Sequence, residues 1–284
     1  MPDFPLIDTH VHVYDPSAIS FPWMADVPQL DSPHGSAEYT AAIGPVAVDK
    51  LVFVEVDAGP GEHLAEARWV ETLARSDSRI AGIVASMPLE DGAATEADIA
   101  AFAKMPLARG VRRLIQGHAS EPDWCLRPAF VEGVKAVGRH GLHFEICIYH
   151  PQMKDAAELV RRCPEVSFVL DHIGKPGIRD GLAEPWGREI RDLAALPNVV
   201  CKLSGVITEA DHRSWTYDQI GPYMSHVIDT FGFDRLVFGG DWPVLELAAT
   251  YPEWVAAVDR VTAGVAVGDL RKLYRDNAIR VYRL

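Results

Sequence analysis

Residues 51–57 read Leu51-Val52-Phe53-Val54-Glu55-Val56-Asp57, a run rich in β-branched and aromatic side chains that predicts a β-strand. Successive strand residues point to opposite faces, so the three valines share one face while Glu55 and Asp57 lie on the other. We expect the valines to meet an outer layer of helices and the two carboxylates to point inward. The polar end of this strand is therefore a first candidate for a functional surface.

Short runs of this kind recur at a steady interval and predict eight strands. They span Leu6–Val13, Leu51–Asp57, Ile80–Ala85, Val111–Gln116, His143–His150, Val166–Ile173, Val199–Ser204 and Leu236–Gly240. Segments with helical spacing separate most of them, at Glu62–Ser76, Pro128–His140, Asp155–Cys163, Tyr217–Phe231 and Pro252–Val261. Because strands and helices alternate, we expect parallel strands with right-handed crossovers, and eight such units favour a closed (β/α)8 TIM-type barrel.

The last segment, Asp269–Leu284, begins with an acidic N-cap candidate and continues with helical spacing, which predicts a C-terminal helix that covers the barrel. No repeat, low-complexity tract or Ser/Gly linker in the sequence marks a second domain. We therefore expect residues 1–284 to form one barrel domain.

Composition and charge narrow the class of protein. The chain has 284 residues, 48% of them hydrophobic, and 40 acidic against 27 basic residues give a formal charge of −13. This charge, without a basic cluster, argues against nucleic acid as a partner and leaves a small molecule as the expected one. The apolar runs are too short for a membrane span, and Met1 to Thr9 carries two acids, so we expect a cytoplasmic protein.

The four cysteines are widely spaced and form no CxxC pair: Cys125, Cys147, Cys163 and Cys201. We expect buried, reduced thiols with a packing role.

Histidines and one aspartate stand at the ends of three predicted strands. The first strand ends in DTHVH, and the two-residue spacing of His10 and His12 places both imidazoles on one face. The sixth strand ends in DHIGKP and carries His172 just before a Gly/Pro break. The eighth ends in FGGDWP, where Asp241 follows two glycines that would let a ligand approach the backbone.

The carboxyl ends of barrel strands meet at one face, so His10, His12, His172 and Asp241 are expected to converge. Such a set suits attack of water on a carbonyl. The carboxylate of Asp241 would take a proton from water and return it to the leaving oxygen, while the imidazoles polarise the carbonyl. The competing interpretation is a solvated loop for His10 and His12 and a hydrogen-bonded core position for His172. For Asp241 it is a helix N-cap or a loop aspartate.

The segments DTHVH at 8–12, DHIGKP at 171–176, KLSG at 202–205 and FGGDWP at 238–243 together resemble the amidohydrolase superfamily, in its branch of sugar-lactone and pyrone-dicarboxylate lactonases. The resemblance spans nearly the whole chain, with the motifs in the family's order. It implies a (β/α)8 barrel that hydrolyses a cyclic ester, with the three histidines at the carbonyl and Asp241 activating water. L-fucono-lactone and L-rhamnono-lactone hydrolases are the nearest comparison within that branch.

The sequence departs from the binuclear members of the superfamily. Those members bridge two metals with a carboxylated lysine on strand four, and Val111–Gln116 contains no lysine. Mononuclear members take a histidine from strand five, where only His143 and His150 are available. One zinc ion is compatible with the residues but not required by them. Its ligands would be His10, His12 and Asp241 with His172 or His150.

Five further residues are candidates for contacts with a sugar acid: Glu55, Arg112, Lys202, Trp23 and Trp242. The three charged ones stand at strand positions that could face inward, where they would hydrogen-bond hydroxyls or instead form structural ion pairs. The two tryptophans would cover an apolar sugar face or simply pack.

The resulting hypothesis is a catabolic hydrolase that opens a small sugar-acid lactone. Two alternatives stand beside it. One is a zinc-dependent non-oxidative decarboxylase of the same barrel class, and the other is a barrel that has lost activity and binds a metabolite.

Overall fold

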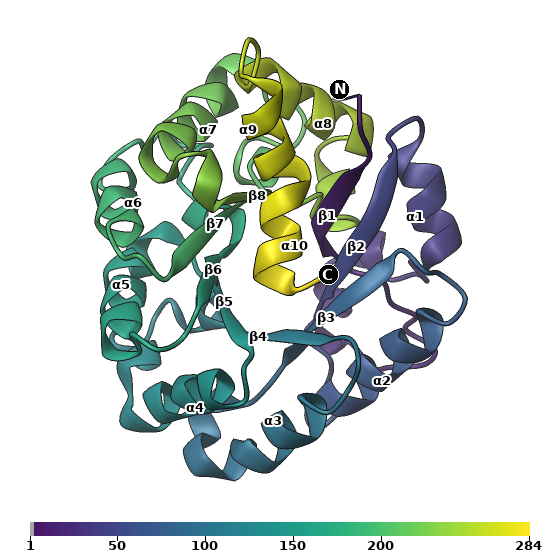
Figure 1. The fold of residues 1–284 in the computed structure, drawn as a ribbon, viewed down its shortest axis with the longest axis vertical. Coiled ribbons are helices and arrows are strands. Elements are labelled where there is room, and N and C mark those ends of the chain that lie inside the picture. The colour runs from purple at the N-terminus through teal and green to yellow at the C-terminus, as the bar shows by residue number, and fades with distance from the viewer. Residues whose placement is uncertain (1–2) are drawn as a thin grey trace.

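Eight parallel strands form one sheet in chain order in the computed structural model, which describes residues 3–284 (Figure 1). Residues 1 and 2 lie outside the described residues. They belong to the predicted domain and to the segment Met1 to Thr9, whose two acids were noted above. The strands are β1 (Leu6–Val11), β2 (Val48–Val54), β3 (Ile80–Ser86), β4 (Ala108–Leu114), β5 (His143–Cys147), β6 (Phe168–Leu170), β7 (Val199–Leu203) and β8 (Leu236–Phe238).

Backbone contacts between the ends of β1 and β8 close the sheet on itself. Asp241 N donates to His10 O at 2.8 Å, and His12 N donates to Trp242 O at 2.8 Å. Val11 and Trp242 form a parallel bridge. The structure is a (β/α)8 barrel, which confirms the predicted fold, and the closure already sets the first strand's histidines beside the eighth strand's aspartate.

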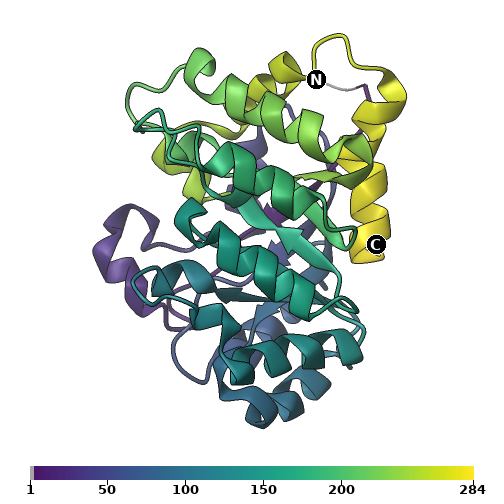
Figure 2. The same cartoon turned by 90° about the vertical axis from the view of Figure 1, so that its left-hand side faces the viewer.

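Helices surround the sheet and follow the strands along the chain (Figures 1 and 2). They are α1 (Ser36–Ile43), α2 (His63–Leu73), α3 (Glu96–Phe102), α4 (Pro128–Arg139), α5 (Met153–Arg162), α6 (Trp186–Ala194), α7 (Tyr217–Phe231), α8 (Tyr251–Val261), α9 (Val267–Arg271) and α10 (Asn277–Tyr282). The predicted helix at 217–231 has the observed bounds, whereas α1, α3 and α6 were not predicted. The described helices are all too short or too polar to cross a membrane.

The C-terminal segment covers the barrel, as expected, and it does so at the amino-terminal end of the strands. Helix α9 continues through a π-helical turn at Lys272–Asp276 into α10, which lies across the ring of strands in Figure 1. Asn277 Nδ2 donates to Leu236 O at the start of β8 at 2.8 Å. The N-cap of α9 is Ala266 rather than Asp269, which lies inside the first turn.

Four apolar strand residues pack against two from α10 to form a buried cluster: Ile7, Val52, Val54 and Val84 with Ala278 and Tyr282. We call this group the amino-terminal plug. The expectation that all three valines of residues 51–57 face the outer helices is therefore wrong for Val52 and Val54. Strand β2 ends at Val54, and the chain then leaves the strand's alternation, so Glu55 points inward as well.

All four cysteines are buried and free, as predicted.

Candidate active site

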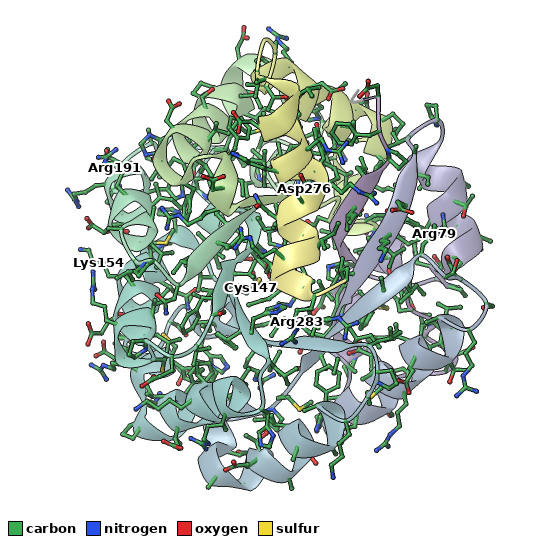
Figure 3. The ribbon with its side chains drawn as sticks, viewed as in Figure 1. Arg79, Cys147, Lys154, Arg191, Asp276 and Arg283 are labelled. Carbon is green, nitrogen blue, oxygen red and sulfur yellow. The ribbon has the colours of Figure 1, made fainter. Side chains whose placement is uncertain are left out.

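A cavity of about 410 Å³ opens at the carboxyl ends of the strands. Six of the predicted site residues line it: His12, Trp23, Glu55, Arg112, His172 and Asp241. Cys147, at the end of β5, also contributes to the wall, and in Figure 3 it projects near the middle of the ring of strands. A volume of this size is typical of small-molecule sites.

Asp241 lies at the floor of the cavity, with three imidazoles around one of its oxygens. Its Oδ1 lies 3.4 Å from His12 Nε2, 3.6 Å from His10 Nε2 and 3.8 Å from His172 Nε2. The structure therefore brings the four predicted residues together within one small volume. His10 has no exposed surface and lies beneath the cavity rather than in its wall.

Each imidazole is held by a contact to its other nitrogen. His12 Nδ1 lies 2.9 Å from Val54 O, and because a carbonyl only accepts, this nitrogen carries a proton. His172 Nδ1 lies 2.9 Å from Ser204 Oγ. His10 Nδ1 lies 3.0 Å from Lys202 Nζ.

Burial and neighbouring charges shift the ionisation of this group. Burial alone would raise the pKa of Asp241, but interactions with His172, His12 and His10 outweigh it and hold the pKa well below its ordinary value. Burial lowers the pKa of His172 to about 4. Burial and the charge of Lys202 lower the pKa of His10 well below its ordinary value. At neutral pH the site therefore pairs an ionised Asp241 with neutral His10 and His172.

Backbone strain concentrates at the same place. Seven described residues other than glycine have positive φ, and four of these line the cavity: Asp57, His172, Lys175 and Asp241. Each such residue costs of order 1–3 kcal/mol, and strain of this kind gathers at functional sites. Gly205 is required here, because a Cβ at this position would lie 2.4 Å from His172 Nδ1.

The two glycines before Asp241 make room for protein groups rather than for a ligand, contrary to expectation. A Cβ on Gly239 would lie 2.8 Å from His10 Cβ, and one on Gly240 would lie 2.5 Å from Asp8 Oδ2. Asp8 Oδ1 accepts from Gly240 N at 2.7 Å and from His10 N at 3.0 Å. This buried carboxylate therefore ties the ends of β1 and β8 together.

The predicted substrate residues divide into two groups by position. Glu55 and Arg112 line the cavity as an ion pair, with Arg112 Nε 2.6 Å from Glu55 Oε1, and Trp23 also lines it. Lys202 lies in the barrel interior, and Trp242 is 1% exposed with its ring nitrogen on Glu246; neither lines the cavity.

Neither strand-five histidine reaches the cavity. His143 begins β5 and lies at the opposite end of the barrel, with Nε2 3.2 Å from Glu145 Oε1. His150 follows β5 in a 3-10 turn. His172 and His150 were the alternatives for a fourth zinc ligand, and His172 is the one that lies beside Asp241.

Imidazole and carboxylate groups of the kind that bind zinc lie together at this site. Ligand atoms of His10, His172 and Asp241 all lie within 4.8 Å of one another, so they would have to move closer to reach the spacing of roughly 3.4 Å expected between ligands of a tetrahedral zinc. This buried cluster could hold a metal. His12 is oriented as a ligand too, because its protonated Nδ1 leaves Nε2 directed at Asp241. His10 is the least suitable ligand of the four. Lys202 Nζ contacts its Nδ1, and a ring that accepts at Nδ1 has its proton on Nε2, the nitrogen that faces Asp241.

Comparison with known proteins agrees with this architecture. The sequence model of the amidohydrolase family matches residues 7–284. The chain belongs to the amidohydrolase family. It is similar to an L-fucono-1,5-lactonase of Burkholderia ambifaria, with 34% identity over 77% of this chain and 76% of the relative.

Two relatives come from Burkholderia multivorans. An L-fucono-1,5-lactonase is 30% identical over 98% of this amidohydrolase and 96% of the relative. A crystal structure of an amidohydrolase with bound zinc is 29% identical, with a TM-score of 0.87 over 99% of this chain and 100% of the other. The family and its barrel are thus established for this chain.

Several residues that organise the site were not singled out from the sequence. Asp171, Glu145, Ser204 and Lys175 contact the predicted residues or line the cavity. Asp171 and Lys175 stand in the same DHIGKP segment as His172, and this adjacency is the one signal that could have identified them.

Proposed function

We propose that this amidohydrolase hydrolyses the lactone of a sugar acid, of the L-fucono-1,5-lactone or L-rhamnono-lactone type, to the free aldonic acid. The proposal rests mainly on the ionised carboxylate of Asp241, whose Oδ1 lies 3.4–3.8 Å from three imidazoles at the floor of a cavity. Similarity to L-fucono-1,5-lactonases over most of the chain supports the substrate class.

The reaction follows from the position of Asp241. Its carboxylate takes a proton from water, and the resulting hydroxide attacks the lactone carbonyl to form a tetrahedral oxyanion. Collapse of this intermediate breaks the ring C–O bond, and the protonated Asp241 gives its proton to the departing alkoxide. The new carboxylic acid then ionises and releases one proton to solution.

The oxyanion needs donors that face the cavity. His172 lines the cavity and is neutral at pH 7, and in the tautomer in which Nδ1 accepts from the hydroxyl of Ser204, its Nε2 would donate to the oxyanion. Arg112 adds a fixed positive charge in the wall. Donors already in place in a buried site stabilise developing charge at low reorganisation cost.

The charges in the cavity wall favour a neutral polyol over a dicarboxylate. Four carboxylates line it, from Glu55, Asp57, Glu209 and Asp241, against the two permanent cations Arg112 and Lys175. Arg112 is already paired with Glu55. A sugar lactone brings hydroxyls that donate to carboxylates, whereas a dicarboxylate would be repelled.

Zinc, where bound, would be held by His12, His172 and Asp241, and would polarise the carbonyl. The residues of the chain supply the base and the donors described above in either case.

The test is a panel of aldonolactones assayed by proton release, with and without chelator. We expect turnover of at least one six-carbon lactone, and Asp241→Asn should lower kcat by about 10²–10⁴-fold because it removes the base. Asp180→Asn, which changes an exposed aspartate, is the matched control and should keep full activity.

Three outcomes would contradict the proposal. Undiminished turnover in Asp241→Asn would remove this residue from its role. Thermal stabilisation by a lactone without turnover would instead indicate a metabolite-binding barrel, and release of carbon dioxide from an aromatic acid would indicate the decarboxylase.

A further inference from the structure

Lys202 is enclosed in the barrel interior with its ammonium group surrounded by three acceptors. Its Nζ lies 2.8 Å from Glu145 Oε2, 2.9 Å from Asp171 Oδ1 and 3.0 Å from His10 Nδ1. The side chain has no exposed surface and does not line the cavity. Two of these contacts, to Glu145 and His10, are hydrogen bonds, and the contact with Asp171 is an ion pair, so the ammonium group is engaged inside the barrel rather than with a substrate.

The contact with His10 constrains where that ring carries its proton. A neutral imidazole has one proton, so only one of its nitrogens accepts a hydrogen bond. Two cationic donors face His10, with Lys202 at Nδ1 and Arg112 Nη1 3.2 Å from Nε2. Only one of these two contacts can be a hydrogen bond to the ring.

Lys202 has the stronger requirement for the ring's acceptor. Arg112 donates Nε to the carboxylate of Glu55 and Nη2 to its backbone carbonyl, and Nη1 has a second acceptor in Asp171 Oδ2, 3.4 Å away. Lys202 is fully buried, and without His10 it would lose one of its two hydrogen-bond acceptors. Leaving a buried charged donor unsatisfied is the costlier arrangement. Nδ1 of His10 therefore accepts, and Nε2 carries the proton.

We propose that Lys202 is a positioning residue, which fixes His10 with its proton on Nε2 so that the ring faces and restrains the carboxylate of Asp241. The two atoms, His10 Nε2 and Asp241 Oδ1, are 3.6 Å apart. The part that concerns water activation rests on the proposed function. The arrangement of His10 and Lys202 stands on its own geometry.

The far end of this chain of contacts is anchored in the amino-terminal plug. Tyr282 Oη on α10 donates to Glu145 Oε1 at 2.7 Å, and the other oxygen of Glu145 holds Lys202. The C-terminal helix is thereby connected to Asp241 through four successive side-chain contacts.

The same geometry makes Lys202 an antagonist of metal binding at His10. A protonated Nε2 cannot ligate zinc. Without Lys202, Nδ1 could donate to Asp171 Oδ1, 3.5 Å away, and Nε2 would present its lone pair to a metal. Lys202→Met should therefore bind zinc about 10-fold more tightly than the wild type, measured by calorimetry on the folded protein.

The decisive measurement uses the wild-type protein and no lactone. Nitrogen chemical shifts of ¹⁵N-labelled histidine, with His10 assigned through its backbone, report which ring nitrogen is protonated. We expect Nε2 to be protonated and Nδ1 to be the acceptor. A proton on Nδ1 of His10 would overturn the proposal, whether or not any variant folds.

Kinetics of three variants separate positioning from packing. Lys202→Met should lower kcat by about 100-fold with KM nearly unchanged, because Lys202 lies outside the cavity wall. Lys202→Gln keeps an N–H donor and should recover part of the loss. Cys201→Ala, on the adjacent outward-facing position of β7, is the packing control and should keep kcat.

A loss in Lys202→Gln as deep as in Lys202→Met, with both proteins folded, would contradict the role of the donor. Unchanged zinc affinity in Lys202→Met would contradict the antagonism at His10. If no lactone is turned over, the proposed function fails, and the nitrogen shifts and zinc affinity still decide the tautomer.

Discussion

The two ends of the barrel interior are stabilised by different interactions. The amino-terminal plug packs apolar side chains under α10, whereas the carboxyl-terminal end buries charges such as Arg112, Lys202 and Asp171. Residues with positive φ, including His172 and Asp241, also gather at the carboxyl-terminal end. The comparison indicates that the plug supplies stability that the charged, strained end does not. Substitutions in the plug should therefore change stability alone, whereas substitutions at the charged end should change stability and activity.

Arg112→Met is the largest expected perturbation of folding at the charged end. It leaves Glu55 and Asp171 buried without their shared cation, and breaking a buried ion pair on one side costs about 3–5 kcal/mol of unfolding free energy. Urea denaturation would measure the loss. The double variant Arg112→Met/Glu55→Gln should recover part of it, and a double variant as unstable as the sum of both single ones would contradict the ionic origin.

Ile7→Ala probes the plug. Ile7 has no exposed surface, so its truncation should cost about 2–5 kcal/mol of unfolding free energy while turnover per folded molecule stays unchanged. Val267→Ala, at a residue that is 59% exposed, is the control and should cost less than about 0.5 kcal/mol. A deep loss of kcat in Ile7→Ala would show that the two ends are not separable.

Gly205→Ala tests the strained backbone around His172. The added methyl would lie 2.4 Å from His172 Nδ1 at a φ of +60°, so the ring must move. We expect a loss of about 1–3 kcal/mol in stability together with a fall of about 10-fold or more in kcat/KM. Gly181→Ala also has positive φ, at +66°, but meets no atom within 4 Å, so it should lose stability without losing activity.

The pH dependence of stability should sharpen the contrast further. The pKa of His172 is about 4 in the folded protein against 6.5 ordinarily, and that of His10 shifts in the same direction. Between these values the unfolded chain binds protons that the folded chain does not, so stability falls as pH falls. Each such histidine contributes at most about 1.4 kcal/mol per pH unit.

Urea denaturation between about pH 7 and about pH 5 would measure this slope. His172→Gln should flatten it, because one of the two histidines is then absent. A slope in the variant equal to that of the wild type would contradict the assignment to His172.

The sequence predicted the barrel well because its order and periodicity are local properties. Eight strands were placed from β-rich runs, and the helix at 217–231 was predicted at its observed bounds. The prediction that Val52 and Val54 face the outer helices was wrong, because both lie in the barrel interior. A period of two separates the two faces of a strand without showing which of them is inside. Helices α1, α3 and α6 were missed, and each spans only seven to nine residues, about two turns in which the helical periodicity is hard to recognise.

Within the site, residue types and positions along the chain indicated Asp241 and its three histidines. Their convergence and protonation were decided by the tertiary structure, because the partner that orients His10 is 192 residues away in the sequence. The separation of Arg112 in the cavity wall from Lys202 beneath it has the same origin. Sequence determines which groups are available at strand ends, while closure of the barrel determines which of them meet a ligand and which meet each other.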